Sequence, residues 1–338
     1  MCGFMVFVGM DHGTTGISFC IMDQNENILD IFKIGREESK NKSVSAIEEL
    51  KKRINLDDID LIAMTYSMGD GISKILPLHE VKNRGILSIN GAGKVTGGGT
   101  FIYSELEDSN IPAILIPGLH EHSDSLDELF KASYSHQASS EKVSIAYNAF
   151  KETNWKNMVV ADISSNSVNI LVENEKIKGA IDACIGAMGI IHGPIDLKMI
   201  RNIDENINTA NECFSRAGAI KIADINGKVV DLKKELLKNY EKGDKKAILA
   251  IDSLVMTVAM EIAGLILVSI NDIEGIVLTG SIGSLKNPFN FKEKINKYFK
   301  NQYKIKVLSP ESGSIGACQI AKDVFNGKKD ILGIEVDL

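Results

Sequence analysis

The sequence of 338 residues predicts an α/β protein built from two duplicated halves. The first half opens on an apolar strand, Met5–Val8, which continues through Gly9 into a turn at residues 11–16 and then into a second strand. Residues 158–173 repeat this design, with an aspartate, Asp162, before a turn of small hydroxyl residues. Helical patterns alternate with strands after each hairpin, which is typical of an α/β fold. Two hairpins of one design indicate a degenerate internal repeat.

The first turn, Asp11-His-Gly-Thr-Thr-Gly16, has the composition of an anion-binding turn. Glycines allow the backbone to approach a ligand, and successive N–H groups with two threonine hydroxyls can bind a phosphate. Asp11 would stand beside that phosphate, where its carboxylate could hold Mg²⁺ or its waters. A plain β-hairpin is the alternative, but a hairpin needs no carboxylate beside two threonines.

The rest of the first half continues the alternation of strands and helices. We expect strands at 28–34, 57–68 and 111–117, and helices at 43–54, 124–134 and 136–150. The glycine-rich segment 90–100, inside an insertion at 85–100, is not a Walker A loop, because Ser88 and Val95 stand where that motif has Gly and Ser or Thr. We interpret it as a mobile loop.

The second half has the same kind of order. Strands are expected at 176–183 and 303–308, and helices at 231–240, 245–269, 289–299 and 312–321. Between them, the strand from Ile273 opens into Thr-Gly-Ser-x-Gly, ending at Gly283. Glycines there would admit a flat base or ribose against the backbone. Small residues after Ser312 would allow close packing, or approach to a phosphate at the helix N-terminus.

Composition narrows the class of protein. A hydrophobic content of 44%, a charged content of 25% and a net charge of −7 fit a soluble globular protein and argue against a nucleic-acid-binding surface. The five cysteines form no Cys-x-x-Cys pair, which fits reduced thiols rather than a zinc site, an iron–sulfur site or disulfides. The most apolar stretch, 247–270, is interrupted by Asp252 and Glu261, so we expect a buried helix and no membrane span. These features predict a cytoplasmic protein.

The repeat places a domain boundary near residue 155, with domains at 1–155 and 156–338 and the option that the last helix packs back on the first domain. Two phosphate-binding turns, one in each domain, could hold a single nucleotide from both sides of a cleft between the domains.

Four motifs, in order, carry a resemblance to a known superfamily. Val8-Gly-Met-Asp-His-Gly-Thr-Thr15 resembles its first phosphate motif and Asp162-Ile-Ser-Ser165 its second. Leu278-Thr-Gly-Ser-Ile-Gly283 resembles its adenosine motif, and Gly313-Ser-Ile-Gly-Ala317 its second connecting helix. The chain therefore resembles the acetate/sugar kinase, Hsp70 and actin (ASKHA) superfamily. This resemblance implies two ribonuclease-H-like (actin-like ATPase) domains with a nucleotide cleft between them.

Further segments resemble one branch of that superfamily. His136-x-x-x-x-Glu-Lys142, Gly189-Ile-Ile-His-Gly-Pro194, Ala217-Gly-Ala219 and Pro310-Glu311 are similar to segments of butyrate and acetate kinases. The whole chain is similar to the methanogenesis marker protein 12 family, an archaeal family without an established activity. The second phosphate motif departs from the usual pattern, since Ser164-Ser165 replaces glycine-containing pairs. The acceptor-binding arginines of those kinases are not clearly matched, and Arg201 and Arg216 are the nearest candidates.

The resemblance implies ATP and Mg²⁺ as cofactors and a role for each matched residue. Asp11 and Asp162 would be catalytic and would hold Mg²⁺, with Glu311 as a third carboxylate. Arg216 would serve catalysis, and Arg216 or His192 would bind the acceptor. The nucleotide would be bound by a larger group of small residues: Gly13, Thr14, Thr15, Ser164, Ser165, Gly280, Ser281 and Gly283.

Three functions remain open at this point. The first is a butyrate- or acetate-kinase-like phosphotransferase acting on a small carboxylate or hydroxyl in methanogen metabolism. The second is an ATP-driven conformational switch that acts on a partner enzyme, and the third is a non-catalytic nucleotide sensor. A homodimer is compatible with all three.

Two other features have a plain alternative. His120-x-His122 could be a metal-binding pair, although such a pair in a loop is more often solvated and a third ligand is not identifiable. Cys184 invites comparison with the iron–sulfur activators of the superfamily, but we interpret it as a small buried thiol.

Overall fold

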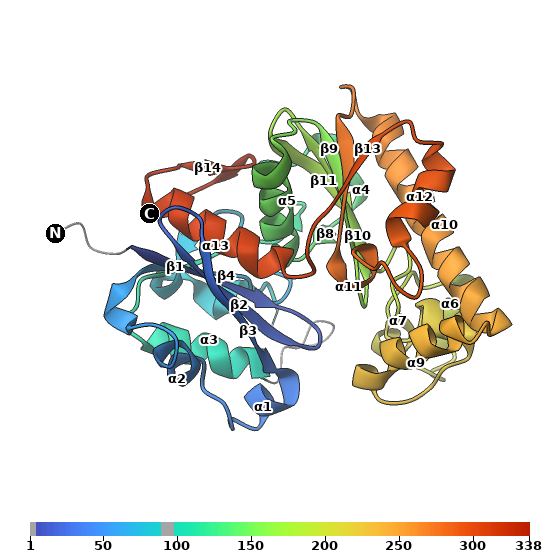
Figure 1. Ribbon diagram of the computed structural model, residues 1–338, viewed down its shortest axis with the longest axis horizontal. Helices are drawn as coiled ribbons and strands as arrows, with labels where there is room; N and C mark the ends of the chain where they lie inside the picture. Colours follow the sequence, from blue (N-terminus) through green and yellow to red (C-terminus); the bar gives the residue numbers. More distant parts are fainter. Residues whose placement is uncertain (1–4, 89–97) are drawn as a thin grey trace. The chain divides into compact units, whose positions relative to one another are not determined.

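The computed structural model describes residues 5–88 and 98–338 and divides the chain into two compact units (Figure 1). Unit 1 comprises Met1–Asn154, Glu175–Gly179 and Glu311–Leu338, and unit 2 comprises Trp155–Asn174 and Ala180–Pro310. The C-terminal segment thus belongs to the same compact unit as the N-terminal strands.

Unit 1 is built on a six-stranded sheet with the order β3-β2-β1-β4-β6-β5. Its strands are β1 (Val6–His12), β2 (Gly16–Asp23), β3 (Ile28–Gly35), β4 (Ile59–Met64), β5 (Leu76–Pro77) and β6 (Ala113–Leu115). β1, β2 and β3 form an antiparallel meander, whereas β4 runs parallel to β1 and β6 runs parallel to β4. The expected opening hairpin and third strand are present.

The two faces of β1 have different partners, because successive side chains of a strand point to opposite sides. Val6, Val8 and Met10 join the apolar core that also holds Ile102 and Tyr103. The opposite face, Phe7, Gly9 and Asp11, lies against α13 (Ser312–Phe325). The ring of Phe7 is 5.5 Å from that of Phe325, and a Cβ on Gly9 would fall 2.1 Å from the carbonyl oxygen of Ser314. Only glycine therefore allows this approach of strand and helix.

The remaining helices of unit 1 are short except for two. They are α1 (Arg36–Lys40), α2 (Ala46–Lys51), α3 (Gly98–Asp108), α4 (Glu128–Ser133) and α5 (Ser140–Thr153). α5 packs against α13, and α3 contacts α1 and α2. Two-stranded pairs complete the unit: β7 (Leu119–His120) with β8 (His136–Ala138), and β14 (Asp330–Ile331) with β15 (Ile334–Glu335).

Two segments predicted in unit 1 differ from the structure at one of their boundaries. The predicted helix at 136–150 begins only at Ser140, because residues 136–138 pair with β7 as strand β8. The predicted glycine-rich loop falls on residues 90–97, which lie outside the described residues, but Gly98–Thr100 already form the first turn of α3. The helix α3 itself was not anticipated from the sequence.

Unit 2 carries a five-stranded sheet with the order β11-β10-β9-β12-β13. Its strands are β9 (Met158–Ile163), β10 (Ser167–Glu173), β11 (Lys176–Ile181), β12 (Gly275–Thr279) and β13 (Lys304–Val307), and the division into units assigns β11 up to Gly179 to unit 1. β9 pairs antiparallel with β10 and parallel with β12. The first strand of each unit therefore stands between its antiparallel hairpin partner and a parallel strand, and this shared topology supports the predicted duplication.

The helices of unit 2 fall into a group of four between β11 and α10, and three that begin with the long helix α10 (Figure 1). The first group is α6 (Leu197–Asp204), α7 (Ala210–Phe214), α8 (Ala219–Ala223) and α9 (Val229–Glu241); the others are α10 (Lys245–Val268), α11 (Gly280–Gly283) and α12 (Phe291–Phe299). Among the described residues, α10 alone is long and apolar enough to cross a membrane. The core helix of a soluble protein can have the same length and composition. One of its faces is buried on β9 and β10.

Candidate functional site

The carboxylate of Asp11 lies at the electropositive end of a helix. A Cβ on Gly313, in the first turn of α13, would fall 2.5 Å from Oδ2 of Asp11. The first N–H groups of a helix lack intrahelical acceptors and carry partial positive charge, which favours an anion at this end. Glycine at 313 thus lets the helix N-terminus and the carboxylate meet.

Thr65, directly after β4, orients Asp11. Its hydroxyl accepts a hydrogen bond from the backbone N–H of His12 at 3.0 Å and donates to Oδ1 of Asp11 at 3.3 Å. In unit 2, Thr279 stands beside Asp162 in the parallel register of β9 and β12. A threonine on the neighbouring parallel strand therefore accompanies the aspartate in each unit, a feature that the sequence motifs did not reveal.

Two cations from β3 and α1 hold the turn after Asp11. The ammonium of Lys33 donates to the hydroxyl of Thr15 at 2.6 Å. The guanidinium of Arg36 donates to the carbonyl oxygens of Gly13 at 3.1 Å and Thr14 at 3.3 Å. Burial lowers the pKa of Lys33, while the negative charges of Asp11 and Glu311 oppose that shift. Lys33 is thus a cation placed near both carboxylates, as binding of phosphate oxygens requires.

An aromatic cluster borders the same turn. The ring of Tyr66 lies 5.3 Å from that of His12, and the guanidinium of Arg84 lies 5.9 Å from the centre of the Tyr66 ring. Burial, with the nearby charge of Arg36, lowers the pKa of His12 to about 3, so this imidazole is neutral near pH 7. Within the described part of the chain, Nε2 of His12 and Nε of Arg84 are buried without a hydrogen-bond partner. Both atoms are thus buried polar groups without a hydrogen bond among the described residues, and Nε2 of His12 lies against Gly99.

In unit 2, Asp162 lies against a tight turn of the backbone. Gly280, the first residue of α11, has φ of +84°, and a Cβ there would fall 2.2 Å from Oδ1 of Asp162. The hydroxyl of Ser164 accepts from the backbone N–H of Ser281 at 2.9 Å and lies 3.5 Å from the same carboxylate oxygen. The turn predicted to bind phosphate and the segment predicted to bind adenosine are thus joined by a direct hydrogen bond.

The other residues of these two motifs serve partly as packing. The carbonyl oxygen of Ser165 accepts from the N–H groups of Ile191 and His192, both at 2.9 Å. Gly283 is buried against Ile163, and the ammonium of Lys233 donates to the carbonyl oxygen of Ser281 at 3.1 Å. The hydroxyl of Ser164 and the carbonyl oxygen of Ser165 therefore already accept hydrogen bonds from other residues of unit 2.

The segment predicted from the butyrate kinase resemblance supports the second turn. A Cβ on Gly189 would fall 2.4 Å from Cα of Asn166, and the N–H of Ile190 donates to the carbonyl oxygen of Ser164 at 3.1 Å. Gly218 packs equally closely on Ile190. Three segments far apart in the sequence thus meet around residues 164–166.

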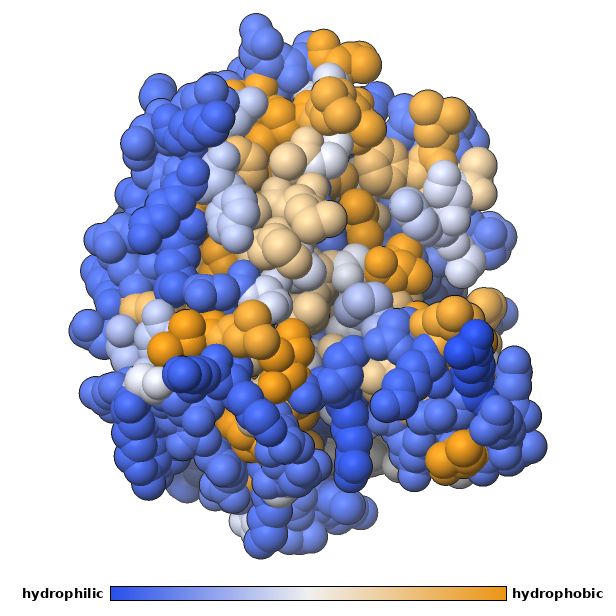
Figure 2. Space-filling view, turned by 90° about the vertical axis from the view of Figure 1, so that its right-hand side faces the viewer, coloured by the Kyte–Doolittle hydropathy of each residue, from blue (hydrophilic) through white to orange (hydrophobic). Residues whose placement is uncertain are grey.

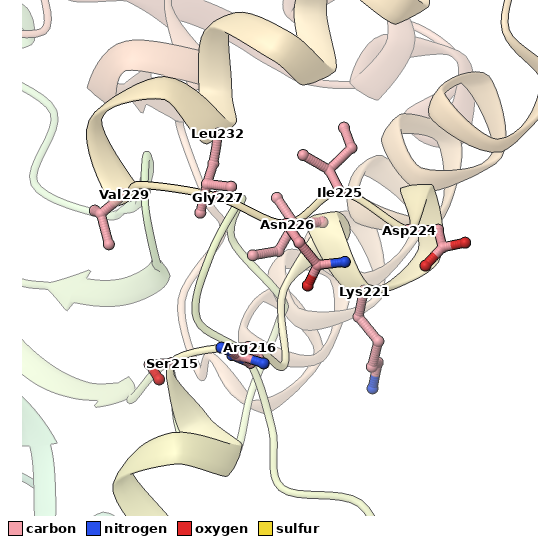
Figure 3. Close-up of a pocket in the computed structure, with 10 residues that line it drawn as sticks. Ser215, Arg216, Lys221, Asp224, Ile225, Asn226, Gly227, Val229 and Leu232 are labelled. Carbon is pink, nitrogen blue, oxygen red and sulfur yellow. The ribbon is translucent and has the colours of Figure 1, made fainter.

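The candidate acceptor residues lie in the helical part of unit 2. His192 stacks on Phe214, with ring centres 4.8 Å apart, and burial lowers the pKa of its imidazole. Arg201 is exposed on α6. Arg216 lines a cavity of about 360 Å³ formed by residues 215–232 (Figure 3). Figure 3 shows Arg216 and Asn226 on facing sides of this cavity.

The carboxylates beside these turns suit Mg²⁺ better than a metal ion that needs three or more protein ligands. Among residues 5–88 and 98–338, no group of three or more His, Cys, Asp or Glu side chains could hold a metal. Mg²⁺ is usually bound by one or two carboxylates with water and substrate phosphates. Asp11 in unit 1 and Asp162 in unit 2 each offer one carboxylate beside a phosphate-type turn, and Glu311 precedes α13.

The histidine pair is structural in the described chain. Nε2 of His120 is 2.8 Å from the carbonyl oxygen of Ile72, and its Nδ1 accepts from the N–H of His122 at 3.3 Å. Both ring nitrogens of the buried His120 are thus occupied. Cys184 is half-buried, and burial together with Asp182 raises the pKa of its thiol to about 11, so it is a thiol and not a thiolate at neutral pH.

The chain was compared with known proteins. No model of a known protein family matches it. A UPF0285 protein of Methanothermobacter thermautotrophicus is 55% identical over 334 residues, which cover 99% of both chains. The chain belongs to the UPF0285 family. A UPF0285 protein of Methanocaldococcus jannaschii is 53% identical over 333 residues, covering 98% of this chain and 99% of the relative.

Several solved structures similar to this UPF0285 chain are acetate or propionate kinases and ROK family sugar kinases. A propionate kinase from Francisella tularensis has a TM-score of 0.69 at 15% identity and covers 94% of this chain and 99% of its own. An acetate kinase from Entamoeba histolytica has a TM-score of 0.65 at 13% identity, covering 95% and 100%. A ROK family glucokinase from Streptomyces griseus, solved with glucose and AMPPNP, has a TM-score of 0.53 at 13% identity, covering 94% and 99%. At these identities the likeness shows the fold, and the predicted two-domain ASKHA fold is confirmed.

Sequence reasoning missed the cations around the first turn. Lys33 and Arg36 lie beyond the recognised motif, at the end of the third strand. The hairpin register could have indicated them, because Gly16 pairs with Gly35 and Ser18 with Lys33. Arg84 lies in an irregular segment in which both Asn83 and Arg84 have positive φ. No periodic pattern of residues predicts such a segment.

Proposed function

We propose that this protein binds Mg-ATP through the two aspartate-containing turns and acts as an acetate- or butyrate-kinase-like phosphotransferase on a small carboxylate or hydroxyl acceptor. The observation that carries the proposal is the first turn: a carboxylate at a helix N-terminus, flanked by Lys33 and Arg36. Phosphoryl transfer needs a metal holder, phosphate donors and cations for the transferring group, and these residues are of those types.

The acceptor would be bound near the first turn or in the helical part of unit 2. Arg84 and neutral His12 offer buried polar atoms without partners in the described chain, which supports the first alternative. Arg216 and His192, the acceptor residues expected from the sequence, support the second. We place the protein in the cytoplasm and in the metabolism of the methanogens that carry its relatives, in line with the marker protein 12 resemblance.

One observation favours a second function, a nucleotide-driven switch or sensor without phosphoryl transfer. The hydroxyl of Ser164 already accepts the N–H of Ser281, and the Ser165 carbonyl is bonded to the 189–193 segment. In addition, the N–H of Ser164 donates to the carbonyl oxygen of Asn166 at 2.7 Å and its hydroxyl donates to Oδ1 of Asp162 at 3.5 Å, so these donors of the second turn are already engaged within unit 2. A protein of this kind would bind ATP and change conformation upon binding or hydrolysis.

Thermal unfolding with and without Mg-ATP tests nucleotide binding. A ligand at about 100 times its Kd stabilises the folded state by about 2.7 kcal/mol, which raises Tm by several degrees in a protein of this size. We expect Asp11→Asn to lose most of the Mg²⁺-dependent part of this shift. Asp124→Asn, at an exposed carboxylate, is the matched control and should behave as wild type.

Measurements of ATP turnover then distinguish the phosphotransferase, the switch and the sensor. Release of ADP that depends on a carboxylate or hydroxyl acceptor supports the phosphotransferase, and ATP hydrolysis that depends on a protein partner supports the switch. Binding without turnover leaves the sensor. An absent Tm shift in the wild-type protein, free of bound nucleotide, would contradict all three.

A further inference from the structure

The outer face of α10 carries a continuous apolar stripe. The exposed fractions of its large side chains are 58% for Leu249, 42% for Met256, 66% for Met260 and 85% for Leu267; Val268 and Ile270 continue it at 58% and 81%. Steps of seven, four and seven residues keep the first four on one side of a helix. Figure 2 looks onto the side that carries α10 and shows pale to deep orange surface along its upper middle. We call these six residues the α10 stripe.

The first four residues of the stripe have a two-fold pattern along the helix, centred at the level of Val258, whose own side chain is buried on the opposite face. Leu249 and Leu267 lie nine residues before and after this point, and Met256 and Met260 lie two residues before and after it. Two smaller residues, Ser253 and Ala263, lie five residues before and after the same point. In a two-fold symmetric interface the same patch of both copies meets, so in an antiparallel pair centred at this level Leu249 meets the partner's Leu267 and Met256 meets the partner's Met260.

The charges at the ends of α10 select an antiparallel arrangement. Lys245 and Lys246 are exposed at its N-terminus, where Lys246 already pairs with Asp224 at 2.9 Å, and Asp272 is exposed just beyond its C-terminus. An antiparallel pair brings the lysines of one copy to the electronegative helix end and Asp272 of the other, whereas a parallel pair brings like charges together. Gly264 faces open space, and with Ala263 it leaves room for close approach of a second helix.

The exposed area approaches that of a standard interface. At the exposed fractions given above, the six residues present on the order of 700 Å² per copy, of which the four on one side of the helix supply about 500 Å², against roughly 800 Å² per partner in a standard interface. Monomeric proteins rarely expose a continuous apolar patch of that size. A membrane surface is the other candidate, but exposed Asp252 stands within the face and the chain is acidic.

We infer that the protein forms a homodimer in which the α10 stripes of two copies pack antiparallel about Val258, with Met256 against the partner's Met260 and Leu249 against the partner's Leu267. This interface lies wholly in unit 2 and does not depend on the proposed function. It gives the protein a two-fold assembly whose contact residues are on a single helix.

Sedimentation equilibrium tests the dimer. The wild-type chain should sediment at twice its mass of 36.9 kDa. Met260→Glu places two carboxylates in the contact and should raise the dissociation constant by about 100-fold or more. Leu129→Glu, which charges an equally exposed leucine of unit 1 at 78% exposure, is the control and should leave the dimer unchanged. Thermal unfolding confirms that each variant is folded.

A charge pair tests the antiparallel register. Leu249→Lys and Leu267→Glu should each weaken the dimer, while the double variant in one chain should recover it, because lysine then meets the partner's glutamate twice. A parallel dimer would oppose like charges and show no recovery. A monomeric wild type at about 100 μM, a Met260→Glu dimer as tight as wild type, or a monomer that co-sediments with anionic lipid vesicles through α10 would each overturn the inference.

Discussion

A buried carboxyl group on the inner face of α10 makes the stability of the fold depend on pH. Glu261 accepts hydrogen bonds from Nδ2 of Asn169 at 2.7 Å and from the backbone N–H of Ala187. Burial raises its pKa to about 7, against these hydrogen bonds, and the charge of Asp182 adds to the rise. The protonated form is therefore the one that the folded state prefers.

The sign of the effect follows from the raised pKa. Below pH 4.5 Glu261 is protonated in both states, and between pH 4.5 and about 7 the unfolded chain ionises first. Folding stability from this residue is therefore fully present at low pH and is lost as pH rises through 7. We expect Glu261→Gln to match wild type near pH 4.5 and to exceed it by up to about 3 kcal/mol at pH 8. Urea unfolding across this range measures the difference, and a constant difference would contradict the assignment.

At the scale of elements, α13 is the most connected helix of unit 1. It covers one face of β1 and packs along α5. Near its C-terminal end, Oδ2 of Asp323 accepts hydrogen bonds from the hydroxyl of buried Tyr147 and, at 3.1 Å, from Nζ of Lys151. Lys151 and Lys322 also meet Glu26, both at 2.8 Å. This partly buried network fixes where α13 lies on the sheet, and so where its N-terminus meets Asp11.

Removal of Asp323 should therefore be costly. Asp323→Ala leaves the Tyr147 hydroxyl without its acceptor, and we expect a loss of about 1–3 kcal/mol in the free energy of unfolding. Asp337→Ala is the matched control, since its ion pair with Lys74 is exposed and 3.7 Å long, and such pairs contribute about 0–1 kcal/mol. Denaturant titration compares the two; equal losses would show that the network is not stabilising.

At the scale of the whole molecule, the chain passes between the two units four times, at residues 154–155, 174–175, 179–180 and 310–311. The C-terminal segment is therefore an integral part of unit 1. Without it, the face of β1 formed by Phe7, Gly9 and Asp11 would lose its cover. An uncovered apolar sheet face is unstable in water.

A truncation tests this dependence. A chain of residues 1–310 should lose the amide hydrogen-exchange protection of β1 and β4, while a chain of residues 1–327, which keeps α13, should retain most of it. Unchanged protection of β1 in the shorter chain would mean that α13 is dispensable for unit 1.

The sequence by itself determined the repeated strand–turn–strand units, the two aspartates and the fold, because these depend on local patterns of apolar residues and glycine. Expected strands and long helices were found with small differences at their ends. The roles assigned to Thr14, Ser165, Gly283 and Arg216 stay predictions, because no ligand contact tests them.

Tertiary structure decided what surrounds each turn. Lys33, Arg36 and Thr65 come near Asp11 and the turn after it through strand register, and Arg84 comes near Tyr66 through an irregular segment. Residues 190–192 reach Ser164 and Ser165 through long-range packing. It also decided that Ser164 bonds Ser281, and that both nitrogens of His120 are occupied. Such pairings depend on contacts between segments far apart in the chain, for which a local pattern of residues carries no signal.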